Sequence, residues 1–181
     1  MVVDSRVFPL EELFADKFEV DFFQREYVWQ EKHITDMMKD LTDAFLKDYQ
    51  LAHTTMDVED YNPYFMGEIV LSKKGDKPGA IIDGQQRITS LTLLLIFLIQ
   101  KYHDVPDFPK DEVSKLVYSN HYGTKRFNLD VKERAECMRS LYDTGEYTLK
   151  TSDPPYLKNI VDRYHDIEGY WDTEIDNKGL S

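Results

Sequence analysis

Five residues that could do chemistry, D-G-Q-Q-R at positions 83–87, interrupt an otherwise apolar stretch of the chain. The isoleucines Ile81 and Ile82 predict the end of a strand just before them. The helix predicted over residues 86–100 is apolar on nearly all sides, which is typical of a helix buried in the middle of a domain. Packing alone does not require an aspartate, two glutamines and an arginine at this junction, so the pattern indicates a binding or catalytic site.

The residue types at this junction fit an anion such as phosphate. Gly84 permits a positive φ and the close approach of another group, and the first N–H groups of the helix attract anions. Arg87 adds a planar guanidinium suited to phosphate. Glutamine amides can bind a base, a sugar or a water, and hydroxyls can contact a phosphate or cap the helix. The residues that offer these groups are Gln85, Gln86, Thr89 and Ser90.

Asp83 is the unusual member of the motif, because its carboxylate repels a phosphate. We expect it to bind a divalent cation, for which oxygen ligands suit Mg²⁺, or to act on a water molecule. Orienting Arg87 is a further role, which we rank below these two. In a purely structural alternative, Asp83 caps the buried helix and pairs with Arg87, so that the motif only holds the helix in place.

A second polar cluster, Q-R-E-Y-V-W, directly follows another strand, which alternating apolar residues predict over residues 18–22. Gln24 and Arg25 repeat the Gln-Arg pair of the first motif. The aromatic side chains of Tyr27 and Trp29 either stack on a base or cover the core. The cluster is therefore a second candidate for the same site.

The elements around both motifs predict a mixed α+β fold. A strand over residues 64–72 and a return strand over residues 80–82 form a predicted hairpin. Apolar residues spaced by three and four predict helices over residues 31–49, 86–100, 110–120, 131–142 and 156–168. Asp130, and either Ser152 or Asp153, are the expected N-caps of the last two helices. We expect a core over residues 1–105 and a helical extension of the same domain over residues 106–181.

Composition argues against several classes of protein. The net charge of −12 disfavours an autonomous nucleic-acid binder, which normally carries a basic surface. The single cysteine, Cys137, excludes an intrachain disulfide and indicates packing rather than catalysis. The histidines lack metal-ligand spacing, and phosphate-loop, dinucleotide-binding and hydrolase motifs are absent. Without a signal-peptide pattern or a long apolar run, we expect a soluble, cytoplasmic protein.

Three segments of the chain resemble the GmrSD-type restriction endonuclease N-terminal domain family. They are F-x-V-x-F-F-Q-R-E-Y-V-W, Y-F-M-G-E-I-V-L and I-I-D-G-Q-Q-R-I-T-S-L-T-L-L, in that order and spacing. The resemblance is strongest over residues 18–102 and implies a ParB/sulfiredoxin-like fold, a small mixed sheet with helices. It also implies a nucleotide-binding and NTP-hydrolysing regulatory domain that serves in defence against phage DNA. The cutting of that DNA is expected from a separate nuclease domain or subunit.

The resemblance implies that the D-G-Q-Q-R motif serves the hydrolysis of nucleoside triphosphates. Asp83 and Arg87 are therefore the expected catalytic residues, with Mg²⁺ at Asp83. Tyr27 and Trp29 are the expected aromatic wall. The expected ligands of the nucleotide and its phosphates are Gln24, Arg25, Gly84, Gln85, Gln86, Thr89 and Ser90. The alternative is a different kind of function, that of a non-catalytic module of ParB-like fold that binds nucleic acid or a partner protein.

The chain departs from the family pattern in a few places. Asp21 and Glu26 stand where the family usually has proline, and Phe23 stands where it has tyrosine. The chain ends at Ser181, before the strand and the Phe…Asn…Gly…Leu segment with which the family normally continues. We therefore expect a truncated domain, with NTPase activity in the full-length protein.

Overall fold

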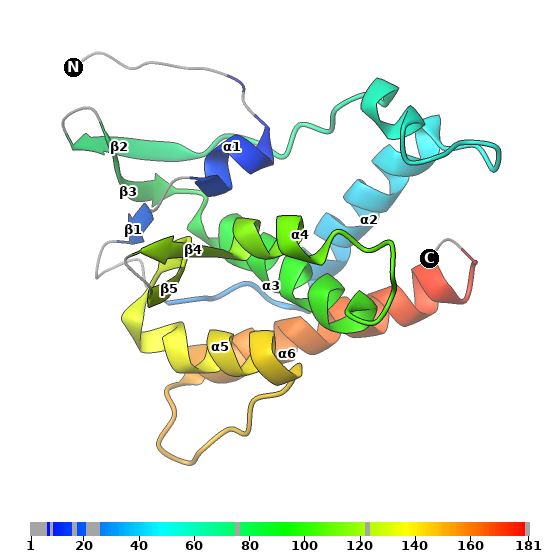
Figure 1. Cartoon of the computed structure of the whole chain (residues 1–181). Coiled ribbons are helices and arrows are strands. Elements are labelled where there is room, and N and C mark those ends of the chain that lie inside the picture. Colours follow the sequence, from blue (N-terminus) through cyan, green and yellow to red (C-terminus); the bar gives the residue numbers. More distant parts are fainter. Residues whose placement is uncertain are drawn as a thin grey trace.

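The computed structural model describes residues 7, 9–15, 18–20, 26–74, 77–121 and 124–179. It confirms a mixed α+β architecture, in which a small sheet adjoins a larger helical body (Figure 1). The helices are α1 (Leu10–Ala15), α2 (Glu31–Asp48), α3 (Gln85–Tyr102), α4 (Lys110–Val117), α5 (Ala135–Thr144) and α6 (Pro155–Tyr170), with short helical turns η2 (Asp57–Asp60), η3 (Lys132–Arg134) and η4 (Trp171–Asp176). The strands are β1 (Phe18–Val20), β2 (Val70–Lys74), β3 (Lys77–Asp83), β4 (Tyr118–His121), β5 (Thr124–Phe127) and β6 (Leu129–Asp130).

The larger sheet brings three strand ends to one edge. Its order is β2-β3-β1-β6, and β1 runs parallel to both β3 and β6. The register pairs Val20 with Ile81 and Glu19 with Asp130, so the carboxyl ends of these strands point the same way. The segments that follow the strands therefore meet at this edge, which is where open α/β sheets commonly bind ligands.

Helix α3 lies in the centre of the helical body, as its all-round apolar sequence predicts. Its side chains at Ile88, Leu93, Ile96 and Ile99 are buried. Helices α4, α5 and α6 all pack against it, and α2 packs on α6 (Figure 1). Burial of this apolar surface is the main source of stability for the helix, because propensity alone contributes little.

Three of the predicted helices, α2, α3 and α6, are confirmed to within three residues at each end, and the β2–β3 hairpin is also present. The prediction of a strand over residues 64–72 is wrong for its first half, because the observed strand β2 begins only at Val70. Gly67, at φ +94°, interrupts the extended chain, and a side chain there would meet the Arg87 guanidinium.

The predicted helix over residues 110–120 ends earlier than expected, at Val117. The chain then enters a β4–β5 hairpin, in which the Tyr118 ring stacks on that of Phe127 with centroids 4.3 Å apart. This cross-strand aromatic pair stabilises strand over helix. The hairpin was not predicted from sequence.

Both predicted capping assignments are wrong. Asp130 lies in β6, paired with β1, and α5 begins only after Arg134. The N-cap of α6 is Pro154, and the Asp153 carboxylate instead accepts hydrogen bonds from the Lys150 N–H and the Tyr147 hydroxyl. None of the helices in the described ranges is both long and apolar enough to cross a bilayer.

We predict that Leu93→Ala lowers the free energy of unfolding by about 2–5 kcal/mol, since it leaves a cavity inside a packed core. Leu51→Ala is the matched control, because Leu51 is 94% exposed while Leu93 is 0% exposed. Urea unfolding followed by circular dichroism measures both changes. Equal effects of the two substitutions would contradict the central position of α3.

Candidate functional site

The start of α3 is an open helix N-terminus at the edge of the sheet. β3 ends at Asp83, Gly84 adopts φ +95° and ψ −1°, and α3 begins at Gln85 without a side-chain cap. The first intrahelical bond runs from the Ile88 N–H to the Gly84 carbonyl, at 3.0 Å. The preceding amides have no intrahelical acceptor, which gives a helix start its affinity for anions.

Glycine is required at position 84 for two reasons. The positive φ is costly for a residue with a Cβ. A Cβ at this position would also lie 2.9 Å from Cγ1 of Ile69, closer than ordinary contact allows. The sharp turn between β3 and α3 therefore depends on this residue.

The structural alternative for Asp83 and Arg87 does not match this geometry. Asp83 is exposed at the end of β3, and no side chain caps α3. Arg87 is half-buried and donates from Nη1 to the Glu68 carbonyl, at 3.0 Å. Among the described residues, no group of three or more His, Cys, Asp or Glu side chains could hold a metal ion.

Gln86 connects the two polar clusters. Its Oε1 accepts the Val28 N–H at 2.9 Å, and its Nε2 donates to the Glu26 carbonyl at 2.8 Å. Its amide thereby pairs with the backbone much as a neighbouring strand would, so it is not free to contact a base or sugar as predicted. Gln24 and Arg25 immediately precede this segment but lie outside the described residues.

The same backbone segment is also held from α6. Asn159 Nδ2 donates to the carbonyls of Tyr27 and Trp29, at 2.7 and 2.8 Å, and Arg163 Nη1 donates to the Trp29 carbonyl at 3.2 Å. Because the segment has no regular secondary structure, these side chains satisfy backbone groups that a sheet would otherwise satisfy.

The hydroxyls of Thr89 and Ser90 were predicted to assist a phosphate, and in this structure both are buried and hydrogen-bonded within α3. They belong to residues that are 1% and 0% exposed. Thr89 Oγ1 donates to the Gln85 carbonyl at 2.8 Å, and Ser90 Oγ donates to the Gln86 carbonyl at 3.0 Å. Since α3 is buried on nearly all sides, these hydroxyls face the interior rather than the open end of the helix.

The predicted aromatic wall is wrong for Tyr27. Its ring is 1% exposed, and its hydroxyl lies 2.7 Å from Ser90 Oγ. Burial raises the pKa of Tyr27 to about 12. Trp29 is half-buried, and its ring stacks on that of His33 with centroids 5.5 Å apart. Tyr27 therefore serves the core, which was the other role considered for it.

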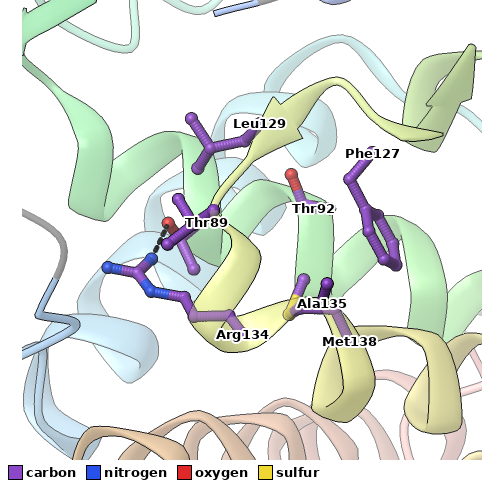
Figure 2. A pocket seen from close by; sticks show the side chains of 8 residues that line it. Thr89, Thr92, Phe127, Leu129, Arg134, Ala135 and Met138 are labelled. Carbon is purple, nitrogen blue, oxygen red and sulfur yellow. Dashed lines mark hydrogen bonds between the residues drawn. The ribbon is translucent and has the colours of Figure 1, made fainter. Parts of the chain in front are cut away.

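The structure adds one residue that the sequence did not indicate, Arg134. It lies in the turn that follows β6, and its side chain extends beside the first turns of α3 (Figure 2). The residue is 3% exposed, and Nη1 donates to Thr89 Oγ1 at 3.2 Å. Its Nε and Nη2 are buried without a hydrogen-bond partner among the described residues, as is Oε1 of Gln85.

Burial lowers the pKa of Arg134 to about 10, so the side chain remains a cation at neutral pH. Next to it lies a small, mostly apolar cavity of about 10 Å³, which is room for a single water at most. The other side chains that line it are those of Thr89, Thr92, Phe127, Leu129, Val131, Ala135 and Met138 (Figure 2). A correct prediction of β6 would have revealed Arg134 as part of a third strand-to-helix junction.

Cys137 is fully buried, and this burial raises the pKa of its thiol to about 12. A thiol that is protonated and enclosed at neutral pH is a poor nucleophile. The expectation that it serves packing agrees with this environment.

All of these features lie within a region of the chain that matches a known protein family. A family model described as GmrSD restriction endonuclease, N-terminal domain, matches residues 10–178. The match includes both polar clusters, β6 and the turn that carries Arg134. No curated protein matches the chain.

We predict that Gly84→Ala lowers the free energy of unfolding by about 1–3 kcal/mol, because of the positive φ and the contact with Ile69. Gly169→Ala is the control, since it lies inside α6 with no atom within 4 Å of the added methyl. That change should stabilise the protein by about 0.5–1 kcal/mol. Chemical denaturation measures both changes, and a shift of the same sign in the two variants would contradict the requirement for glycine at position 84.

We predict that Gln86→Glu lowers the free energy of unfolding by about 1–3 kcal/mol at pH 7, since a carboxylate cannot donate to the Glu26 carbonyl. The protonated carboxyl can donate, so folding raises its pKa. The deficit is therefore small at low pH and grows as pH rises through the folded-state pKa. Urea unfolding from pH 4 to 8 measures it, with Gln50→Glu at an exposed position as control. A deficit independent of pH would count against this pairing.

Proposed function

Because the chain belongs to the GmrSD restriction endonuclease N-terminal domain family, we propose that it is a nucleotide-binding, NTP-hydrolysing regulatory domain of a restriction system. Family membership associates the chain with restriction, which is directed at DNA. The nucleotide part of the proposal is carried by one observation, the uncapped start of α3 directly after the parallel strand β3. A phosphate bound there would accept hydrogen bonds from the backbone amides that follow Gly84.

Positive charge near the start of α3 favours the binding of an anion at this edge of the sheet, although the whole chain is acidic. The helix start contributes roughly half a positive charge, and the guanidinium of Arg87 lies on the first turn. The net charge of −12 would repel DNA and free nucleotides elsewhere on the surface. In this proposal DNA is contacted through the nuclease domain or subunit of the restriction system rather than through this domain.

Asp83 and Arg87 have distinct roles in the proposed hydrolysis. The exposed carboxylate of Asp83 orients the attacking water or binds Mg²⁺. A magnesium ion usually takes one or two protein carboxylates and completes its shell with phosphates and waters, and a single Asp83 fits that mode. When bound, the ion would neutralise phosphate charge. Arg87, held by the Glu68 carbonyl through Nη1, keeps a positive charge beside the phosphoryl group.

We extend the proposal to the finer fold and to the domain division. A small sheet of order β2-β3-β1-β6, followed by a buried helix, supports a ParB/sulfiredoxin-like arrangement. The proposed core covers residues 1–105 and the helical extension residues 106–181. The proposal that the two parts form one domain is supported by β6, which the extension contributes to the sheet.

A second candidate, a non-catalytic module that binds a partner protein, is supported by exposed apolar side chains. The segment between α2 and β2 projects from the helical body (Figure 1). It exposes Leu51 at 94%, Met56 at 82% and Phe65 at 66%. Apolar side chains that gather in one exposed patch are typical of surfaces that bind another protein.

We predict that Asp83→Asn lowers phosphate release from nucleoside triphosphates by about 100-fold or more, as expected for loss of a group that acts on water or metal. Triphosphate binding without Mg²⁺ should persist, because the backbone amides remain. Phosphate release with ATP, GTP, CTP and UTP, and calorimetric titration of each, measure the two effects. Asp104→Asn is the control, with a side chain that is 89% exposed.

The unsubstituted protein also tests the two candidate functions against each other. If it neither binds nor hydrolyses any of the four triphosphates, the nucleotide proposal fails. A salt-sensitive shift of duplex DNA, or co-purification with a defined nuclease subunit and without nucleotide turnover, would support the binding module instead.

A further inference from the structure

Within the described part of the chain, only one of the three guanidinium nitrogens of Arg134 donates a hydrogen bond. Nη1 donates to Thr89 Oγ1, while Nε and Nη2 have no partner among the described residues. Nε and Nη2 lie on the same side of the planar group, so their N–H bonds form a fork. Such a fork matches two oxygens of a phosphate or carboxylate.

This arrangement is unfavourable for a residue with only a structural role. Arg134 is 3% exposed, and its one hydrogen-bond partner in the described chain is a neutral hydroxyl. Buried charges in proteins are normally paired with an opposite charge, because an unpaired one loses its hydration without compensation. An apolar side chain would fill the same space at lower cost. The guanidinium is therefore a candidate group for binding an anion.

The guanidinium of Arg134 lies beside the first turns of α3 (Figure 2). Thr89 joins the two, since its Oγ1 accepts from Arg134 and donates to the carbonyl of Gln85, the first residue of the helix. Nη1 of Arg134 thus contacts a residue that lies about one helical turn from the first residue of α3. The start of α3 and Arg134 come from two different strand ends, those of β3 and β6, which point to the same edge of the sheet.

We propose that the Nε and Nη2 edge of Arg134 binds a phosphate group of the ligand whose phosphates occupy the start of α3. The identity of that ligand as a nucleotide rests on the function proposed above. A phosphoryl group fits better than a carboxylate, because it has oxygens for the fork and further oxygens for the helix amides. A carboxylate would use both of its oxygens on the fork alone.

The two free nitrogens are enclosed in this structure, and the cavity beside them has about 10 Å³ of space. Phosphate binding therefore requires local opening around Arg134. The competing explanation is one buried water in this cavity that satisfies the edge, in which case Arg134 is only structural.

Titration calorimetry with pyrophosphate and with each of the four nucleoside triphosphates tests the proposal. The variants are Arg134→Lys, which keeps the charge and removes the fork, and Arg134→Met, which removes both. We expect each to weaken binding at least tenfold. Arg139→Lys is the control, because it removes a guanidinium from the exposed face of α5 and should leave the affinity unchanged.

Thermal unfolding without ligand separates a binding role from a structural one. If Arg134 is retained for a ligand, Arg134→Met leaves the melting temperature unchanged or raises it, since an unpaired buried charge is removed. A large fall in melting temperature for Arg134→Met, together with unchanged affinity in Arg134→Lys, would overturn the proposal.

The binding measurements also distinguish a failure of the proposed role of Arg134 from a failure of the proposed nucleotide function. Triphosphate binding that survives in Arg134→Lys refutes the role of Arg134 and leaves the function standing. Binding of pyrophosphate that depends on Arg134, without binding of any nucleoside triphosphate, supports the phosphate site and refutes the nucleotide. Binding of neither probe by the unsubstituted protein refutes both.

Discussion

The burial of α3 together with its polar first turns is the constraint on which the rest of the structure depends. A helix enclosed by α4, α5 and α6 gains stability from its apolar side chains. The polar side chains of its first turns must then find partners inside the protein, because an unsatisfied buried polar group is costly. Gln86, Thr89 and Ser90 meet this requirement through the backbone at residues 26–28, through Arg134 and through Tyr27.

These bonds have a consequence for the arrangement of the whole site. They tie two segments, residues 26–28 and the turn that carries Arg134, to a single helix end. Asn159 and Arg163 on α6 bind the same backbone segment that Gln86 binds. A shift of α6 would therefore be transmitted to the polar cluster at the start of α3.

The distribution of charge separates the site from the surface. The chain carries a net charge of −12, but positive groups gather at the start of α3: the helix end itself, Arg87 and Arg134. In a partly buried position these charges interact strongly with an anion, because little water screens them. Most of the acidic residues lie on exposed positions, where solvent weakens their effect. The phosphate site proposed above would thus lie in a locally positive region of a chain that is acidic overall.

The sequence by itself determined the local features. Apolar periodicity predicted α2, α3 and α6, and the succession of strand, glycine and apolar helix predicted the open helix start at Gly84. The motifs in their order and spacing also identified the family. These features depend on residues close in the chain, where spacing and residue type carry the information.

The tertiary structure decided which side chains face the site and which face the core. Tyr27 and Ser90 are 63 residues apart, and Arg134 and Thr89 are 45 residues apart, yet each pair forms a hydrogen bond. No local pattern specifies such pairs, because periodicity predicts which face of a helix is buried but not what covers it. For the same reason β6 was missed, since it pairs with β1, which lies more than 100 residues away in sequence.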